Sequence, residues 1–301
     1  MPLKLIDKIA IPAAQGSAFD HGAFDAKTRR VFVAHTGHNC VEVIDHDTRK
    51  HVATLQGFPE VAGVVADDGQ VLVTNRGSAT LAWIDAASLE TRSVFGTGFR
   101  PNGAAIAARQ GLAIAACIGD ETHASELQCI DLRGGKRTSL DLPGQPRWCV
   151  MDADARRVFL AIREPSMILV ARLPDLGDVQ HWKLPVAGAH GLDINHRDGR
   201  LYVACDDAAV VEVDASSGEV MNQWPIAGAP DVTFFNPSTN AVHVAIGKPG
   251  LIQSIDLRTN TSAQTMTNPR AHTTAIVAPD TLYVFSPSSG EALVFQDAKN
   301  F

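Results

Sequence analysis

The chain lacks long hydrophobic runs, paired cysteine motifs and an excess of positive charge. No apolar segment approaches the ~20 residues that a membrane-spanning helix needs, so we expect no membrane partner. The 301 residues carry a formal net charge of −7, which argues against a nucleic-acid partner. The five cysteines show no CxxC spacing. We therefore expect mostly reduced core thiols, with neither a zinc knuckle nor a disulfide framework.

Targeting signals and common catalytic signatures are also missing. Residues 1–9 lack the apolar core and small-residue cleavage site of a signal peptide. We therefore expect a cytoplasmic protein, or a periplasmic one if a leader was trimmed from the chain. The sequence contains no nucleophile elbow, P-loop, dinucleotide fingerprint or HExxH motif. No segment shows sustained helical periodicity, so the fold must be inferred from what recurs.

One pattern recurs along the whole chain. A short β-branched run is followed by a polar turn and a second run that often ends in Asp, as in VFVAH at 31–35 and VEVID at 41–45. Such runs are typical of hairpin strands, and their period of about 40 residues is typical of a propeller with four strands per blade. Seven copies predict an all-β, seven-bladed β-propeller of antiparallel strands, with residues 1–301 as a single domain.

The two ends of the chain suggest how this ring closes. The last copy ends near Gln296 without a fourth strand, and the segment from Leu3 to Ile11 is a strand without a blade. Pairing the two removes exposed sheet edges, so we expect the N-terminal strand to complete the last blade. The aspartates that end the third strands are expected to cap the turns that follow. They are Asp45, Asp85, Asp131, Asp214 and Asp256.

The first repeat resembles a known family. It runs VFVAHTGHN from Val31, then VID at 43–45 and VATL at 52–55, and it is similar to the YVTN repeat. The resemblance covers essentially the whole chain, with the fourth blade the least regular. It implies a propeller and leaves the activity open, because YVTN-type propellers include enzymes, cofactor carriers and surface proteins.

One repeat position carries residues suited to chemistry. Ligand sites of propellers usually form at the channel mouth, where the first strand of each blade begins. Aligned there, the column reads His21, Ala62, Asn102, Arg147, His190, Asp231 and His272. With 11 histidines in 301 residues, seven random positions would hold fewer than one on average, and this column holds three. The histidines and Asp231 fall on blades 5, 6, 7 and 1, which are neighbours in the ring.

Imidazole nitrogens with a carboxylate suit a divalent transition metal, so we predict that His21, His190, Asp231 and His272 bind zinc, iron, manganese, nickel or copper. Calcium prefers oxygen ligands and is a poorer match. Two other interpretations stay open. The column is either a ring of polar side chains hydrogen-bonded in a wet channel, or a metal-free acid–base site. His35, His38 and His123 lie in loops on the same face, where a solvated histidine is the more common role, although His35 could reach the site from blade 1. The 119–126 loop is a candidate lid over the mouth.

The opposite side of the mouth is predicted to bind an anion. Asn102 and Arg147 share the column with the histidines, Arg76 and Arg163 follow the second strands of blades 2 and 4, and Arg100 enters blade 3. Guanidinium groups bind carboxylate or phosphate in a bidentate fork. We therefore predict a small anionic substrate, while ion pairs of these arginines with Glu60, Glu121 or Glu164 are the alternative.

These residues support two hypotheses about function. The first is a metal-dependent enzyme acting on a small anionic molecule, most simply by lactone or ester hydrolysis, with Asp231 or His190 as catalytic base. A metal-dependent lyase or oxidoreductase fits the same residues. The second is a non-catalytic propeller that binds a protein, peptide or cofactor on its top face. The oligomeric state stays open, because a closed ring has no sheet edge that demands a partner.

Overall fold

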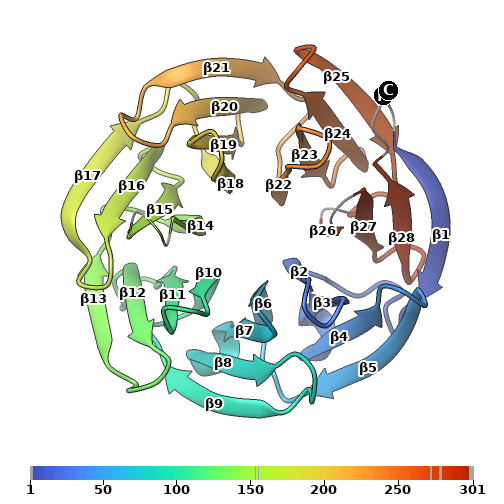
Figure 1. Cartoon of the computed structure of the whole chain (residues 1–301), viewed down its shortest axis with the longest axis horizontal. Helices are drawn as coiled ribbons and strands as arrows, with labels where there is room; N and C mark the ends of the chain where they lie inside the picture. Colours follow the sequence, from blue (N-terminus) through green and yellow to red (C-terminus); the bar gives the residue numbers. More distant parts are fainter. Residues whose placement is uncertain (1–2, 153, 155, 272, 278–279, 298–301) are drawn as a thin grey trace.

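The computed structural model describes all residues except 1–2, 153, 155, 272, 278–279 and 298–301. The described residues form seven four-stranded antiparallel sheets arranged in a ring around a central channel (Figure 1). The predicted seven-bladed β-propeller is therefore confirmed. None of the helices in this part of the chain is long or apolar enough to cross a membrane.

Blades 1 to 6 are each a meander of four consecutive strands, with the first strand at the channel (Figure 1). Blade 1 consists of β2 (Gly22–Asp25), β3 (Arg30–His35), β4 (Cys40–Asp45) and β5 (Lys50–Gln56). Blade 2 consists of β6 (Val61–Asp67), β7 (Gln70–Asn75), β8 (Thr80–Asp85) and β9 (Thr91–Gly96). Blade 3 consists of β10 (Pro101–Ala107), β11 (Leu112–Cys117), β12 (Glu126–Asp131) and β13 (Arg137–Asp141).

The remaining blades repeat this order. Blade 4 consists of β14 (Pro146–Asp152), β15 (Arg157–Ile162), β16 (Met167–Arg172) and β17 (Gly177–Lys183). Blade 5 consists of β18 (Ala189–Asn195), β19 (Arg200–Cys205), β20 (Ala209–Asp214) and β21 (Val220–Pro225). Blade 6 consists of β22 (Thr233–Asn236), β23 (Ala241–Ile246), β24 (Leu251–Asp256) and β25 (Thr261–Met266).

Blade 7 is built from both ends of the chain. Its strands are β26 (Thr273–Val277), β27 (Thr281–Ser286), β28 (Glu291–Gln296) and β1 (Lys4–Ala10). Strand β1 pairs antiparallel with β28, from Lys4 opposite Gln296 to Ala10 opposite Glu291. The predicted closure of the ring by the N-terminal strand is therefore confirmed. Two short 3-10 helices, η1 (Thr36–His38) and η2 (Arg76–Ser78), join the second and third strands of blades 1 and 2.

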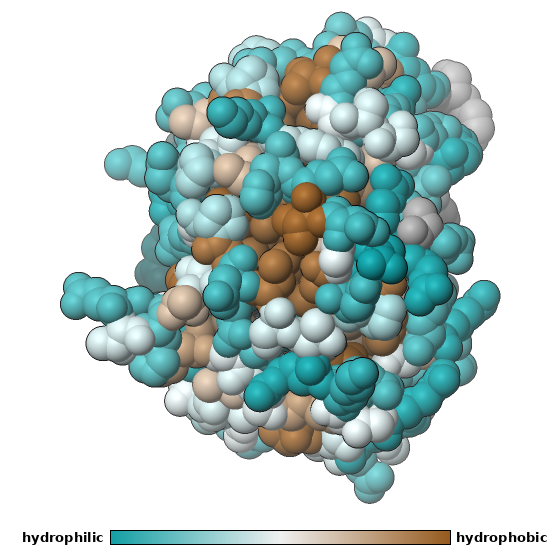
Figure 2. Space-filling view, turned by 90° about the vertical axis from the view of Figure 1, so that its left-hand side faces the viewer, coloured by the Kyte–Doolittle hydropathy of each residue, from teal (hydrophilic) through white to brown (hydrophobic). Residues whose placement is uncertain are grey.

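The core lies between neighbouring blades. Seven clusters of buried apolar side chains occur in the described chain, one at each junction between two blades. The second and third strands are covered on both faces, which is why they read as continuous apolar runs. The fourth strands are mostly exposed or half-buried because they form the outer edge of each blade, and those of blades 2 and 3 alternate the two. From the side where Figure 1 places β13 and β17, the surface is mostly hydrophilic, with apolar residues near its middle (Figure 2).

Two further predictions concern single residue types. The aspartates at the ends of the third strands accept backbone N–H bonds from the turn, as Asp45 does from Thr48 at 2.8 Å and Asp85 from Ser88 at 2.9 Å. They are turn caps, as predicted. All five cysteines are buried and free of disulfides, which confirms them as core thiols. Burial raises the pKa of the Cys205 thiol to about 12, so that thiol stays protonated at neutral pH.

Candidate functional site

A cavity of about 610 Å³ opens at the mouth of the central channel. It lies where the first strands begin, on the face that also carries the connections between second and third strands. Five residues of the predicted column line it, and they come from blades 1, 3, 4, 5 and 6. They are His21, Asn102, Arg147, His190 and Asp231.

The ring therefore brings together residues that lie far apart in the sequence. Arg76 and Arg100 line the cavity as well. Arg163 does not; its guanidinium points to Asp206 beside the cavity. His272, the fourth predicted metal ligand, lies outside the described residues.

His190 is held by an aspartate and an arginine. Its Nδ1 lies 2.8 Å from Oδ1 of Asp206, whose Oδ2 accepts a hydrogen bond from Nε of Arg163 at 2.6 Å. Both oxygens of the Asp206 carboxylate therefore act as acceptors, because a guanidinium can only donate. An ionised carboxylate only accepts, so Nδ1 of His190 carries the proton. In the neutral ring the lone pair is therefore on Nε2.

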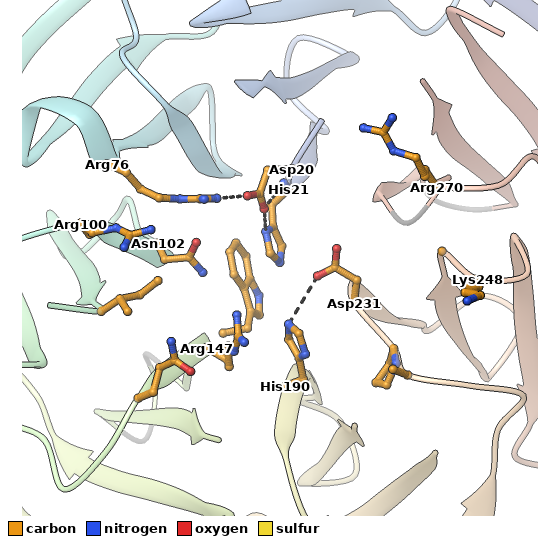
Figure 3. A pocket seen from close by; sticks show the side chains of 16 residues that line it. Asp20, His21, Arg76, Arg100, Asn102, Arg147, His190, Asp231, Lys248 and Arg270 are labelled. Carbon is orange, nitrogen blue, oxygen red and sulfur yellow. Dashed lines mark hydrogen bonds and ion pairs between the residues drawn. The ribbon is translucent and has the colours of Figure 1, made fainter. Parts of the chain in front are cut away.

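The Nε2 atom of His190 lies 3.5 Å from Oδ1 of Asp231, on the cavity side of the ring (Figure 3). Burial lowers the pKa of His190, and the negative charges of Asp231 and Asp206 partly offset this effect. At neutral pH the ring is therefore mostly unprotonated, with its basic nitrogen facing a carboxylate that would stabilise an added proton. This arrangement suits a general base.

His21 repeats the same arrangement on blade 1. Its Nδ1 lies 2.6 Å from Oδ1 of Asp20, and Oδ2 of Asp20 is paired with Arg76. The imidazole stacks on the indole of Trp148, with ring centroids 3.7 Å apart and planes at 1°. The aspartate and the indole together fix the orientation of this ring. Two histidines, each held by an aspartate through Nδ1, thus line one cavity.

Positive charge gathers at the same mouth. Arg147 lies in the column between Asn102 and His190, and Nε of its guanidinium is buried without a hydrogen-bond acceptor among the described residues. Burial and the neighbouring Arg163 lower the pKa of Arg147, although a guanidinium remains cationic in proteins. A cation with a donor to spare at a cavity wall can bind an anionic ligand.

Several of these residues were not singled out from the sequence. Asp20 and Asp206 orient the histidines, and Lys248 and Arg270 add cations to the cavity lining. Repeat position offers a signal for two of them. Asp206 directly follows a second strand, as Arg76 and Arg163 do, and Arg270 precedes the column residue by two positions, as Arg100 does. Aligning the repeats at these two positions as well would have identified Asp206 and Arg270 from the sequence.

The arginines that were expected as alternatives to pair with glutamates have other partners. In the described chain, Arg76 pairs with Asp20 and Arg163 with Asp206, and neither pairs with Glu60 or Glu164. Both partners follow from the ring, which places Arg76 beside the start of blade 1 and Arg163 beside blade 5. These two arginines therefore support the histidines through their aspartates.

His35 does not line the cavity, and it is not the solvated loop histidine that its position suggested. Its side chain is fully buried inside blade 1, bonded to Glu42 at 2.8 Å and to Ser17 at 2.9 Å. His35, Cys40 and Glu42 are the one group of three metal-type donors in the described chain whose ligand atoms all lie within 4.8 Å of one another. Each of the three already has a hydrogen-bond partner inside this network.

The predicted lid loop folds on itself beside the mouth. His123 in this loop stacks on Phe99 with centroids 4.4 Å apart, and its Nδ1 lies 2.9 Å from Asp120. Of this loop and its flanks, Ile118 lines the cavity. Closure of the loop over the mouth stays a prediction.

Comparisons with known proteins support the fold. No family model matches the chain, and no curated protein matches its sequence. The chain is similar in structure to a streptogramin B lyase, with a TM-score of 0.82, 12% identity, and 96% of each chain covered. It is also similar to virginiamycin B lyase from Staphylococcus aureus, with a TM-score of 0.81, 14% identity, and coverage of 98% and 99%.

A third similar structure is the hydrazine synthase of Kuenenia stuttgartiensis, with a TM-score of 0.81, 12% identity, and coverage of 96% and 98%. At such identities the likeness concerns the seven-bladed ring. Unrelated activities occur on one fold, so the function must be argued from the cavity. Membership in the YVTN-repeat family stays a prediction.

Proposed function

We propose that this protein is an enzyme that performs acid–base chemistry on a small anionic molecule bound at the channel mouth. The observation that carries this proposal is the environment of His190. Its Nδ1 is held by Asp206, and its Nε2 faces Asp231 in a cavity that also contains Arg147. A non-catalytic ring of polar side chains would need neither a lowered pKa nor a fixed tautomer at this histidine.

The roles follow from the chemistry of each group. Arg147 binds an anionic oxygen of the substrate and, with Asn102, stabilises negative charge that develops during the reaction. His190 removes a proton through Nε2, and Asp231 stabilises the imidazolium that forms. The simplest reaction is hydrolysis of an ester or lactone, in which the proton comes from the attacking water. Elimination, in which the proton comes from carbon, is the alternative that the same groups serve.

A chromogenic ester pair tests this proposal. The 4-nitrophenyl monoester of succinic acid carries a carboxylate, whereas 4-nitrophenyl butyrate has the same chain length and none. We expect hydrolysis of the anionic ester to be at least tenfold faster, and His190→Gln to lower its kcat about 100-fold. Equal rates for both esters that do not change in His190→Gln would contradict esterase chemistry at this site and favour the non-catalytic propeller.

As an alternative use of the same two side chains, we propose that one divalent transition metal binds between His190 and Asp231, in which case Nε2 of His190 coordinates the ion and does not act as the base. Two ligands on a tetrahedral zinc ion lie roughly 3.3 Å apart, and Nε2 of His190 lies 3.5 Å from Oδ1 of Asp231. His21, His190 and Asp231 do not form a group within 4.8 Å in the described chain. His21 would therefore join the set only after its ring leaves Trp148. When bound, the metal would polarise a substrate oxygen.

Elemental analysis of protein purified without a metal-affinity tag tests the metal. If the metal-bound alternative holds, the protein contains about one equivalent per chain, lost in Asp231→Asn and kept in Glu42→Gln, which alters the separate group on blade 1. Retention in Asp231→Asn with loss in Glu42→Gln would place the ion at His35, Cys40 and Glu42 instead. Metal-free protein that takes up none on reconstitution would contradict the metal and leave acid–base chemistry by His190.

A further inference from the structure

Two groups of cations line the cavity on opposite sides of the histidines. Arg76, Arg100 and Arg147 come from blades 2, 3 and 4, and Lys248 and Arg270 come from the loops of blades 6 and 7. In Figure 3 the first group lies on one side of His21 and His190 and the second lies on the other.

Ring position accounts for this division. His21 belongs to blade 1 and His190 to blade 5, so a line through them divides the mouth into a side with blades 2 to 4 and a side with blades 6 and 7. Each side carries at least two cations. A ligand that contacts both sides therefore passes the side chains of His21 and His190 with its middle atoms.

Arg100 and Arg270 occupy the same repeat position on nearly opposite blades. Each stands two residues before its column residue, and each has a left-handed backbone, with φ of 54° and 66°. Blade 5 has Gly188 at this position, with φ of 77°. A residue with a side chain adopts this conformation less readily than glycine does. Blade 2 has Glu60 at this position, also left-handed with φ of 47°. The conformation thus recurs in the repeat, and it places an arginine at each of two facing sites on one cavity.

Most of these cations have no internal counter-charge. The described residues that line the cavity include five cations and two carboxylates, Asp20 and Asp231, which leaves three positive charges in excess among them. In the described chain no carboxylate lies within 4.0 Å of the charged nitrogens of Arg100, Arg147, Lys248 or Arg270. The chain as a whole carries a net charge of −7. The positive excess is thus a local property of this mouth.

From these observations we propose that the substrate carries two anionic groups, carboxylate or phosphate, one at each end. One group binds Arg100 and Arg147, the other binds Lys248 and Arg270, and the reacting atoms between them lie against His190. The inference rests on the proposed function and adds a substrate class to it. A substrate with one anionic group would use one side of the mouth and leave the other side's cations without a partner.

Matched acids of equal chain length test the inference by isothermal titration calorimetry. The pairs are butyrate with succinate, pentanoate with glutarate, and hexanoate with adipate. Carboxyalkyl phosphonates of the same lengths distinguish phosphate-like from carboxylate recognition of the second group. We expect the diacid to bind at least tenfold more tightly than its monoacid at one or more lengths, because a charge-assisted bond contributes about 1.5–3 kcal/mol.

Two variants assign the two ends. Arg270→Gln is expected to remove the advantage of the diacid and to leave the affinity for the monoacid unchanged. Arg147→Gln is expected to weaken both. Arg197→Gln is the control, because this arginine is exposed and pairs only with its neighbour Asp198 in the described chain.

The outcomes separate this inference from the proposed function. If monoacids bind through Arg147 and the second acid group adds less than twofold at every length, the two-ended substrate is wrong while the anion site stands. An advantage of the diacid that survives Arg270→Gln also contradicts the inference. If no probe binds, or Arg147→Gln changes nothing, both the anion site and the proposed function are wrong.

Discussion

His190 lies between two carboxylates that have different partners. Asp206 accepts from Nδ1 and is itself bound by Arg163, whereas Asp231 faces Nε2 across 3.5 Å. The first contact fixes the tautomer, and the second stabilises the protonated ring. His21 has the first contact through Asp20 and has the indole of Trp148 against its ring. An aspartate therefore orients each histidine through Nδ1, whereas the other neighbours of the two rings differ.

Asp206→Asn tests this assignment at the residue scale. Burial lowers the pKa of His190 and Asp206 raises it, so removal of this charge is expected to lower that pKa further. A base works only when unprotonated, so the acid limb of the pH–rate profile should move to lower pH. The amide can also donate to Nδ1 and favour the other tautomer, which should lower kcat about tenfold or more.

The measurements are the pH–rate profile on the anionic ester and the ¹⁵N NMR titration of His190. Asp207→Asn is the matched control, since Asp207 is exposed and next in sequence. A merely structural Asp206 would predict lower stability with an unchanged acid limb and tautomer. That result would contradict the positioning role.

At the scale of the element, the packing of neighbouring first strands sets how closely the column residues of adjacent blades approach one another. A Cβ added to Gly103 on β10 would lie 2.4 Å from the carbonyl oxygen of Arg147. A Cβ added to Gly191 on β18 would lie 2.6 Å from the carbonyl oxygen of Asp231. Each glycine directly follows a column residue and contacts the column residue of the next blade. A side chain at either position would push the neighbouring strand away from the channel.

Gly103→Ala is therefore expected to lower both stability and anion affinity. The added methyl group overlaps a backbone oxygen, which costs about 1–3 kcal/mol of unfolding free energy, and the shift moves Arg147. Gly96→Ala is the control, because β9 leaves its Cβ position 4.0 Å from the nearest atom, in Arg137. Chemical denaturation and succinate titration of both variants provide the check. Equal stability of the two would show that the inner strands adjust without cost.

At the scale of the whole molecule, the two ends of the chain close one ring. Strand β1 supplies the fourth strand of blade 7, and Ile9 on its inner side packs with Tyr283 and Val294 in the cluster between blades 7 and 1. Because each blade buries its faces against two neighbours, loosening this one junction affects the entire ring. The candidate site depends on that closure, since His21 follows β1 in the chain.

Ile9→Ala is expected to lower the free energy of unfolding by about 2–5 kcal/mol, in one cooperative transition of the ring. Lys8→Ala on the same strand should change it by no more than about 0.5 kcal/mol, because Lys8 is exposed and its contact with Glu291 is 3.9 Å. Thermal unfolding followed by circular dichroism provides the measurement. A separate early transition in Ile9→Ala, with the remainder of the ring unchanged, would contradict closure as a global constraint.

The sequence by itself determined the ring and one column of the site. Hairpin strands are specified by short apolar runs with turn residues between them, and each of the seven repeats contains both. Counting the repeats therefore predicts seven blades, and the strand left over at the N-terminus predicts the pairing of β1 with β28. The column could also be predicted from the sequence, because the symmetry of the ring places equivalent positions of all repeats at the same mouth of the channel. Five of its residues line the cavity as a result.

Only the tertiary structure decided which side chains meet. Asp206 contacts His190 within one blade, whereas Asp20 joins His21 to Arg76 across two blades, and Trp148 reaches His21 across the channel from blade 4. These contacts depend on how far each side chain extends from its strand and on the spacing between blades. Repeat position alone does not specify either quantity. The same reason explains why His35, on the same face by its position, lies inside blade 1 with Glu42.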